Sequence, residues 1–420
     1  MRKAILASVL SLLACVGSGF AQDKLLPPVA TPPVTVAQPV IADGTWSAGV
    51  STAPRGWVAF DYLNWWISPG PIGVPLVTTG NPASPTGGAI GDPSTVVLFG
   101  NSNVNFGPLQ GGRLSMGYWF DCEAKCGIEA SAFLLATQRN TFIASSDAGG
   151  NPLLALPFFT PGGVAGRTLI SSPAVPQTGS VLVGMSTSLW GADVNAVWNC
   201  YRDCACSIDL LAGFRYYNLH ETLGLGANTA ADPTATRIPF NADFFFTSKI
   251  NTLASGFDYF STRNQFFGGQ IGARAAWHDG PCSAEILGML AMGRTARSLY
   301  ANGASISSTT TTISKFTTAG VRVSSITTAT QTATVGGFYT NPNNIGTFDS
   351  CGFSVVPQVE FKLGYDVTRN LRVTIGYDAM YWTNVLRPGN QISNVIGAGP
   401  LNNGSNVWVN GFNAGLQYRW

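Results

Sequence analysis

The last ten residues, "GFNAGLQYRW" (residues 411–420), alternate between large apolar side chains and small or polar ones. Counted back from the end in steps of two, the apolar set is Trp420, Tyr418, Leu416, Ala414 and Phe412. A period of two is the period of a β-strand whose two faces meet different surroundings. The stretch predicts a strand. Whether water, lipid or a protein core surrounds each face must be inferred from the rest of the sequence.

The N-terminus has the features of a secretory signal peptide. Arg2 and Lys3 give a basic start, residues 4–13 are an apolar run too short to span a bilayer, and Ala21 ends a small-residue cleavage site. We expect residues 1–21 to be removed on export. The alternative is a lipoprotein site with acylated Cys15, which Leu13 fits poorly.

The next segment, residues 22–54, contains "LPPVATPPVTVAQP". Paired prolines favour an extended, semi-rigid chain that cannot form a packed core. We interpret this segment as a periplasmic linker.

The amino-acid composition is compatible with two classes of all-β protein. Without its leader the chain has 21 basic and 21 acidic residues, so it offers no charge pattern for nucleic acid. It is 45% hydrophobic, yet no apolar stretch of 18 residues follows residue 21, which excludes a membrane-spanning helix. A secreted β-domain and a lipid-facing barrel both remain.

The lengths of the connections favour the barrel. Short connections (121–126, 200–206, 278–282 and 365–370) alternate with long ones (68–110, 136–184, 220–265, 294–352 and 383–405). Transmembrane barrels have tight periplasmic turns, long outer loops and an even strand number. We predict a closed antiparallel β-barrel over residues 55–420 with about ten strands: 56–67, 111–120, 127–135, 185–199, 207–219, 266–277, 283–293, 353–364, 371–382 and 406–420. A protruding hairpin in the Ser/Thr-rich segment 301–335 would raise the number to twelve.

The two faces of the strands support the same fold. In segment 185–199 one face carries Trp190, Val194 and Trp198, while the other carries Asp193 and Asn195. Two tryptophans eight residues apart match the spacing of the aromatic belts of a membrane barrel. A sheet in hydrocarbon must close on itself because lipid satisfies no free edge. A soluble β-sandwich is the alternative.

Charged residues collect on the predicted inner face. The set has seven acids and six bases: Asp61, Arg113, Glu129, Asp193, Asp209, Arg215, Arg274, Glu285, Glu360, Lys362, Arg372, Asp378 and Arg419. Such an even mixture predicts ion pairs that fill a narrow or closed lumen rather than a selective charged ring. Structural pairing is the simpler interpretation of each residue.

The cysteines gather at the short turns. Six of them, Cys122, Cys126, Cys200, Cys204, Cys206 and Cys282, are predicted to lie at the periplasmic rim, where export permits disulfides. Cys122 with Cys126, and Cys200 with Cys204 or Cys206, would close their own turns, and the remaining one could reach Cys282. Cys351 would stay free. A thiolate metal site is the alternative, but no histidine joins the cluster at zinc-site spacing.

No catalytic or cofactor motif accompanies the strands. The chain has two histidines, and His278 lies in a predicted turn. His220 has the lipid-facing parity beside Asn218, which permits a lipid hydrolase that uses a nearby serine, but no serine motif is present. We therefore expect neither an enzyme nor a cofactor nor a metal site.

Several segments resemble a known family. They are "YLNWWISPGPIGVPLVTTG" (62–80), "VVLFG" (96–100), "GGRLSMGYWFD" (111–121), "GIEASAFLL" (127–135) and "FSTRNQFFGGQIGARAAW" (260–277). They are similar to the outer-membrane porins labelled beta-barrel porin seven, from about Trp57 to Trp420. The resemblance implies insertion by the barrel-assembly machinery, which reads a C-terminal aromatic strand. Phe412, Leu416, Tyr418 and Trp420 would supply it here, although the last residue of such strands is more often Phe.

The resulting hypotheses concern an outer-membrane protein surrounded by lipid, with homo-oligomerisation left open. The first is a porin-like passive channel for small solutes or a structural envelope barrel. The alternative is a closed barrel that displays its loops for adhesion or envelope integrity. A lipid hydrolase is the remote third.

Overall fold

The structure is a computed structural model that describes residues 55–232, 235–239 and 243–420. The signal peptide and the proline-rich linker predicted for residues 1–54 lie outside the described residues. In the described part, no helix combines the length and apolarity needed to cross a membrane.

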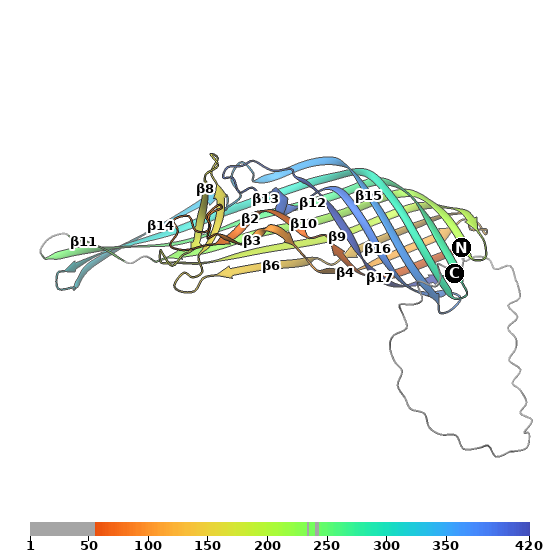
Figure 1. Cartoon of the computed structure of the whole chain (residues 1–420), viewed down its shortest axis with the longest axis horizontal. Coiled ribbons are helices and arrows are strands. Elements are labelled where there is room, and N and C mark those ends of the chain that lie inside the picture. The colour runs from red at the N-terminus through yellow and green to blue at the C-terminus, as the bar shows by residue number, and fades with distance from the viewer. Residues whose placement is uncertain (1–54, 233–234, 240–242) are drawn as a thin grey trace, which may run out of the picture. The chain divides into compact units, whose positions relative to one another are not determined.

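Ten strands form one closed ring, which Figure 1 shows as a set of tilted ribbons running side by side. In ring order they are β1 (Gly56–Ile67), β4 (Pro108–Trp119), β5 (Cys126–Leu135), β9 (Gln177–Arg202), β10 (Cys206–Ala231), β12 (Phe244–Asp279), β13 (Cys282–Thr317), β15 (Gly346–Asp366), β16 (Leu371–Leu386) and β17 (Gly404–Arg419). Every neighbouring pair is antiparallel, and β17 returns to β1 with Arg419 opposite Trp57. The predicted closed antiparallel barrel is confirmed.

Several ring strands extend well beyond their predicted ends. Segments 220–265 and 294–352 were expected to be loops, but β10 continues to Ala231, β12 begins at Phe244 and β13 continues to Thr317. The extensions stay paired because their inner faces are covered by further chain. Leu223 and Phe260, for example, are 0% and 1% exposed.

Three strands attach to the ring without entering it. They are β6 (Gln138–Ser145), β11 (Thr236–Pro239) and β14 (Arg322–Val335), which pair with β9, β12 and β13 respectively. The hairpin expected within residues 301–335 is thus present as β13–β14. Because β13 pairs onward with β15, β14 stays outside and the ring keeps ten strands.

A second sheet lies at the long-loop end of the ring (Figure 1). It has four strands, β2 (Gly70–Thr79), β3 (Val96–Val104), β7 (Leu154–Phe159) and β8 (Ala165–Ser171), in the order β3-β2-β7-β8. The short 3-10 helix η2 (Pro388–Gln391) follows β16. The apolar side of this sheet packs against the inner faces of the extended strands, through residues such as Leu76, Leu156, Val183 and Leu225. We call it the plug sheet.

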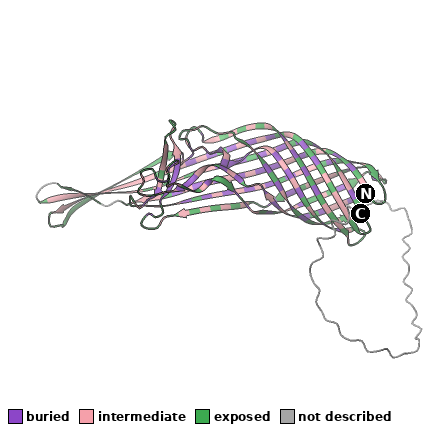
Figure 2. Ribbon diagram, in the orientation of Figure 1, coloured by how far each residue is buried: buried purple, intermediate pink, exposed green. Residues whose placement is uncertain are grey.

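The outer face of the ring is apolar. Figure 2 shows exposed and buried residues alternating along the strands. Trp190 and Trp198 are 42% and 64% exposed, and Tyr377 is 39% exposed, so none of them packs in a dry protein centre. On β17 Phe412, Leu416 and Tyr418 are exposed on the outer face, and Trp420, directly after the strand, is exposed as well. An apolar outer face around an interior that holds the charged residues is the arrangement of a membrane barrel.

The prediction of turn-closing disulfides is wrong for this structure. All seven described cysteines, including Cys122, Cys126 and Cys282, are free thiols. Carboxylates hold the turns instead. Asp121 accepts the backbone N–H groups of Lys125 and Cys126 at 2.8 and 2.7 Å, and Asp203 does the same for the turn before β10. These bonds fix the tight turns without a covalent link.

Candidate functional site

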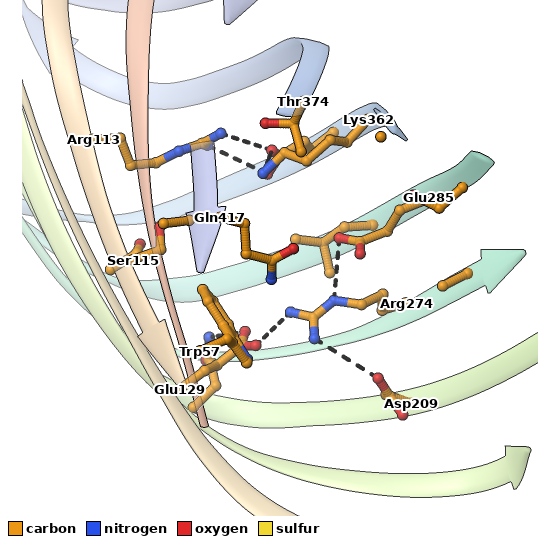
Figure 3. A pocket seen from close by; sticks show the side chains of 18 of the residues that line it. Trp57, Arg113, Ser115, Glu129, Asp209, Arg274, Glu285, Lys362, Thr374 and Gln417 are labelled. Atoms are coloured by element: carbon orange, nitrogen blue, oxygen red, sulfur yellow. Dashed lines mark hydrogen bonds and ion pairs between the residues drawn. The ribbon is translucent and has the colours of Figure 1, made fainter. Parts of the chain in front are cut away.

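The barrel interior is the candidate site, and its first layer is ionic. All thirteen charged residues predicted for the lumen are buried or half-buried on the inner side of the ring. Ten of them, all but Asp61, Asp378 and Arg419, line a cavity of about 220 Å³ near the short turns. Figure 3 shows side chains from several strands converging on this cavity.

One ionic cluster is centred on Arg113 of β4. Its guanidinium lies 3.1 Å from Asp61, 2.7 Å from Glu360 and 3.3 Å from Asp378. Lys362 joins from β15 and lies 3.0 Å from Glu360. The cluster therefore ties together strands from both sides of the β1–β17 closure.

A second cluster is centred on Arg274 of β12 (Figure 3). It pairs with Glu129, with Glu285 at 3.4 Å and with Asp209 at 3.7 Å. Arg215 lies 3.9 Å from Asp193 beside this cluster. Each charge of these two clusters has an opposite partner, which offsets the cost of burying it.

The remaining two predicted residues lie at the rim. Arg372 and Arg419 both pair with Asp366, Arg372 at 2.7 Å. Sequence reasoning placed Asp366 in a turn and missed this role. It also missed two buried amides between the clusters, those of Gln270 and Asn413. Gln270 donates to Asn195 at 2.5 Å, and Asn413 donates to Asp378 at 2.7 Å.

An apolar layer crosses the interior above the ionic clusters. It is a single cluster of buried side chains to which every ring strand contributes at least one residue. Its members are Leu63, Trp65, Ile67, Leu109, Phe133, Leu135, Leu189, Tyr217, Leu219, Phe266, Ala291, Val356, Met380, Trp382, Val385, Val407 and Val409. Aromatic rings meet across it, with centroids of Tyr217 and Trp382 6.1 Å apart. Side chains from the whole circumference therefore fill this level of the barrel.

Two buried polar anchors hold the plug sheet and its neighbours above the apolar layer. Arg387 pairs with Glu221 of β10 at 2.7 Å and donates to the backbone oxygens of Ser68 and Pro69 at 2.9 and 3.0 Å. These contacts tie the start of η2 to the connection that leads into β2.

The second anchor is Asp258 of β12. Its carboxylate accepts the backbone N–H groups of Phe338, Tyr339 and Thr340 and the hydroxyl of Thr340, at 2.6 Å for the last. Tyr339 in turn donates to the backbone oxygen of Leu76 in β2. Sequence reasoning missed both anchors, although Glu221 and Asp258 have the inward parity of Tyr217 and Phe260 on the same strands.

This geometry defines a class of protein: a ten-stranded membrane barrel of the outer-membrane type, with an ionic, an apolar and a β-sheet layer inside. The chain belongs to the family described as Putative beta barrel porin-7 (BBP7), whose family model matches residues 57–420. The expectation from the quoted motifs is thereby confirmed, and the family places the barrel in an outer membrane.

Solved structures show distant likenesses. The outer membrane protease OmpT from Escherichia coli is 11% identical with a TM-score of 0.39, covering 88% of this chain and 98% of that one. A Pseudomonas aeruginosa FadL homologue is 8% identical with a TM-score of 0.23, covering 87% and 90%. The Ralstonia pickettii toluene transporter TbuX is 9% identical with a TM-score of 0.21, covering 88% and 90%. The search of curated proteins found no match.

Proposed function

We propose that this protein is a closed envelope barrel that holds the plug sheet and its long strand extensions at the outer surface, and that it does not conduct solutes in this conformation. The apolar layer carries the proposal, because all ten ring strands fill the same level with buried side chains. Of the channel and the closed barrel, the closed barrel has the better support.

The barrier to an ion has a clear physical origin. An ion that enters from the short-turn end meets ionic clusters in which acids and bases are balanced, so no ring of one sign attracts it. It would then have to shed its water to pass between side chains such as Trp65, Phe133 and Trp382. Apolar constrictions close channels by excluding water, and bare charge is costly to desolvate.

The test is conductance of the purified full-length chain in a planar lipid bilayer. We expect the inserted wild-type barrel to give no discrete current steps. The double variant Phe266→Ala, Trp382→Ala removes two facing rings, whose centroids are 6.1 Å apart, and should produce them. The matched control, Phe412→Ala with Trp408→Ala, removes the same ring types from the outer face and should stay silent.

Insertion must be checked separately, because each large-to-alanine change in a packed core costs about 3–5 kcal/mol. Circular dichroism and heat-dependent gel migration report whether a silent variant is still a folded barrel. Regular current steps from the wild-type protein would contradict the closed barrel and support passive diffusion.

A second candidate function rests on one contact. His220 Nε2 lies 3.0 Å from Ser261 Oγ on the outer face, and a histidine-activated serine is a nucleophile for ester hydrolysis. Within the described residues no side chain hydrogen-bonds His220 Nδ1, so the third member of a triad is missing. Fatty-acid release from phospholipid vesicles that is abolished in both Ser261→Ala and His220→Ala would favour this candidate. No release by the wild type would dismiss it.

A further inference from the structure

The outer face of β9, β10 and β12 ends its apolar band in an aromatic belt at the long-loop side. Trp190, Tyr216 and Phe267 lie on three neighbouring strands of the ring. The ring centroids of Trp190 and Tyr216 are 5.0 Å apart, and those of Tyr216 and Phe267 are 4.9 Å apart. Below them towards the short turns the outward residues are apolar, for example Leu210 and Ile271, which are 51% and 58% exposed. The belt therefore marks the boundary between hydrocarbon and headgroups.

A polar patch begins at this boundary. Arg263 of β12 lies opposite His220 of β10 on one side and Ser298 of β13 on the other. Ser261 and Gln265 flank it on its own strand and share its outward face, and Arg294 lies opposite Phe267 at the level of the belt. We call His220, Ser261, Arg263, Gln265, Arg294 and Ser298 the outer arginine patch.

The two arginines of the patch differ from the ion-paired arginines inside the barrel. Arg113, Arg274 and Arg387 each pair with carboxylates. Arg263 and Arg294 are exposed and make no ion pair within the part of the chain that the structure describes. The patch thus offers two free guanidinium groups at the depth where lipid headgroups lie.

The nearby carboxylates do not neutralise the two arginines of the patch. Asp349 of β15 is exposed opposite Ser298, and it forms no ion pair with either arginine. Glu221 follows His220 in sequence but points inward and is bound by Arg387. An anion from outside the chain can therefore reach the guanidinium groups.

We propose that the outer arginine patch binds the phosphate of a lipid headgroup in the leaflet on the long-loop side. The planar guanidinium of Arg263 matches two phosphate oxygens, and the hydroxyl of Ser298 is a further donor on the same face. Gln265 Nε2 donates to Tyr216 Oη at 2.8 Å, and its second N–H is a further donor. Arg294 is exposed at the level of the belt, where a long arginine side chain can extend its guanidinium to the headgroups. The acyl chains then lie along the apolar band, which favours a lipid over free phosphate as the ligand.

The test is lipid binding to the full-length barrel in neutral detergent, measured by native mass spectrometry. The probes are phosphorylated lipid A, its dephosphorylated counterpart, phosphatidylglycerol and inorganic phosphate. We expect retention of a phosphorylated lipid and little of the dephosphorylated one. Arg263→Gln with Arg294→Gln should weaken binding by at least about tenfold, since a hydrogen bond between charged groups contributes about a factor of ten or more.

The matched control is Arg237→Gln with Arg322→Gln, which removes the same charge from β11 and β14 beyond the ring. It should bind like the wild type. Both double variants change exposed residues, and heat-dependent migration should show that they remain folded barrels. Equal binding by the patch variant and the wild type would overturn the proposal, as would equal retention of the dephosphorylated lipid or saturation by inorganic phosphate alone. None of these results depends on whether the lumen conducts.

Discussion

At the residue scale, the buried ion pair of Arg387 and Glu221 ties the region of the plug sheet to the ring. Arg387 and Glu221 are 1% and 2% exposed as side chains, so each charge depends on the other. Breaking a buried pair by removing one partner costs about 3–5 kcal/mol, whereas replacing both by apolar residues is often nearly neutral. The pair is thus a sensitive point of a region that is otherwise held by apolar contacts.

We expect Arg387→Met to lower the free energy of unfolding by about 3–5 kcal/mol, because it leaves Glu221 buried without a counter-charge. Urea titration of the reconstituted barrel, followed by protease cleavage within residues 68–110, measures the loss. The double variant Arg387→Met, Glu221→Leu should recover most of it. A double variant as unstable as the single one would show that hydrogen bonds to Ser68 and Pro69, rather than charge, dominate.

A second residue-scale prediction concerns the loop between β2 and β3. Hydrogen bonds from Ser84, Ser94 and Thr86 hold the pKa of the Asp92 carboxyl well below its usual value. Because the folded pKa is lowered, this carboxylate stabilises the loop fully above the ordinary Asp pKa of about 3.9, and the effect is lost as pH falls through the folded value.

Hydrogen-exchange protection factors for residues 81–95 measure this effect. They should stay constant from neutral pH to about pH 4 and fall only in stronger acid. Asp92→Asn should lower them already at neutral pH and remove the acid dependence. Asp147→Asn is the control, because Asp147 accepts the N–H groups of Gly149 and Asn151 in another loop. A protection profile that Asp92→Asn leaves unchanged would refute the assignment.

At the scale of the elements, alternation predicted which strands form the ring but not where they end. Trp190, Asp193 and Trp198 show the two-residue period that a wall between lipid and interior imposes. Beyond the membrane the outer face meets water, so serine, threonine and glycine replace apolar residues and the contrast fades, as in the Ser/Thr-rich part of β13. The two-residue alternation between inward and outward positions nevertheless continues to Glu221 and Asp258. Extending the predicted strands by this alternation would have placed both anchor residues on the inner face.

The plug sheet could not be predicted from local pattern. Its two hairpins come from separate connections, and Thr78 of β2 meets Ala155 of β7 across 77 residues. Neither hairpin has a complete core alone; each gains one against the extended ring strands. Such pairing depends on a ring that already exists. Sequence spacing also misled the prediction for the cysteines. Their spacing is compatible with disulfides that close the short turns, but in the structure hydrogen bonds to Asp121 and Asp203 stabilise these turns.

At the scale of the whole molecule, the two ends of the ring differ, just as its inner and outer faces do. The short turns with their exposed cysteines lie at one end, and the plug sheet and the extensions of β12, β13 and β14 lie at the other (Figure 1). In outer-membrane barrels the short turns face the periplasm and the long connections face outward. The C-terminal strand ends at the short-turn side, where Trp420 exchanges two backbone hydrogen bonds with Gly56.

This orientation predicts opposite labelling of two single-cysteine variants on intact cells. Cys204 is exposed in a short turn, and Thr328→Cys places a thiol on the fully exposed strand β14. With the other cysteines changed to serine, a membrane-impermeant maleimide should modify position 328 on intact cells and Cys204 only after the outer membrane is permeabilised. Labelling of Cys204 first would reverse the orientation, and it would move the outer arginine patch to the inner leaflet while leaving the closed lumen unaffected.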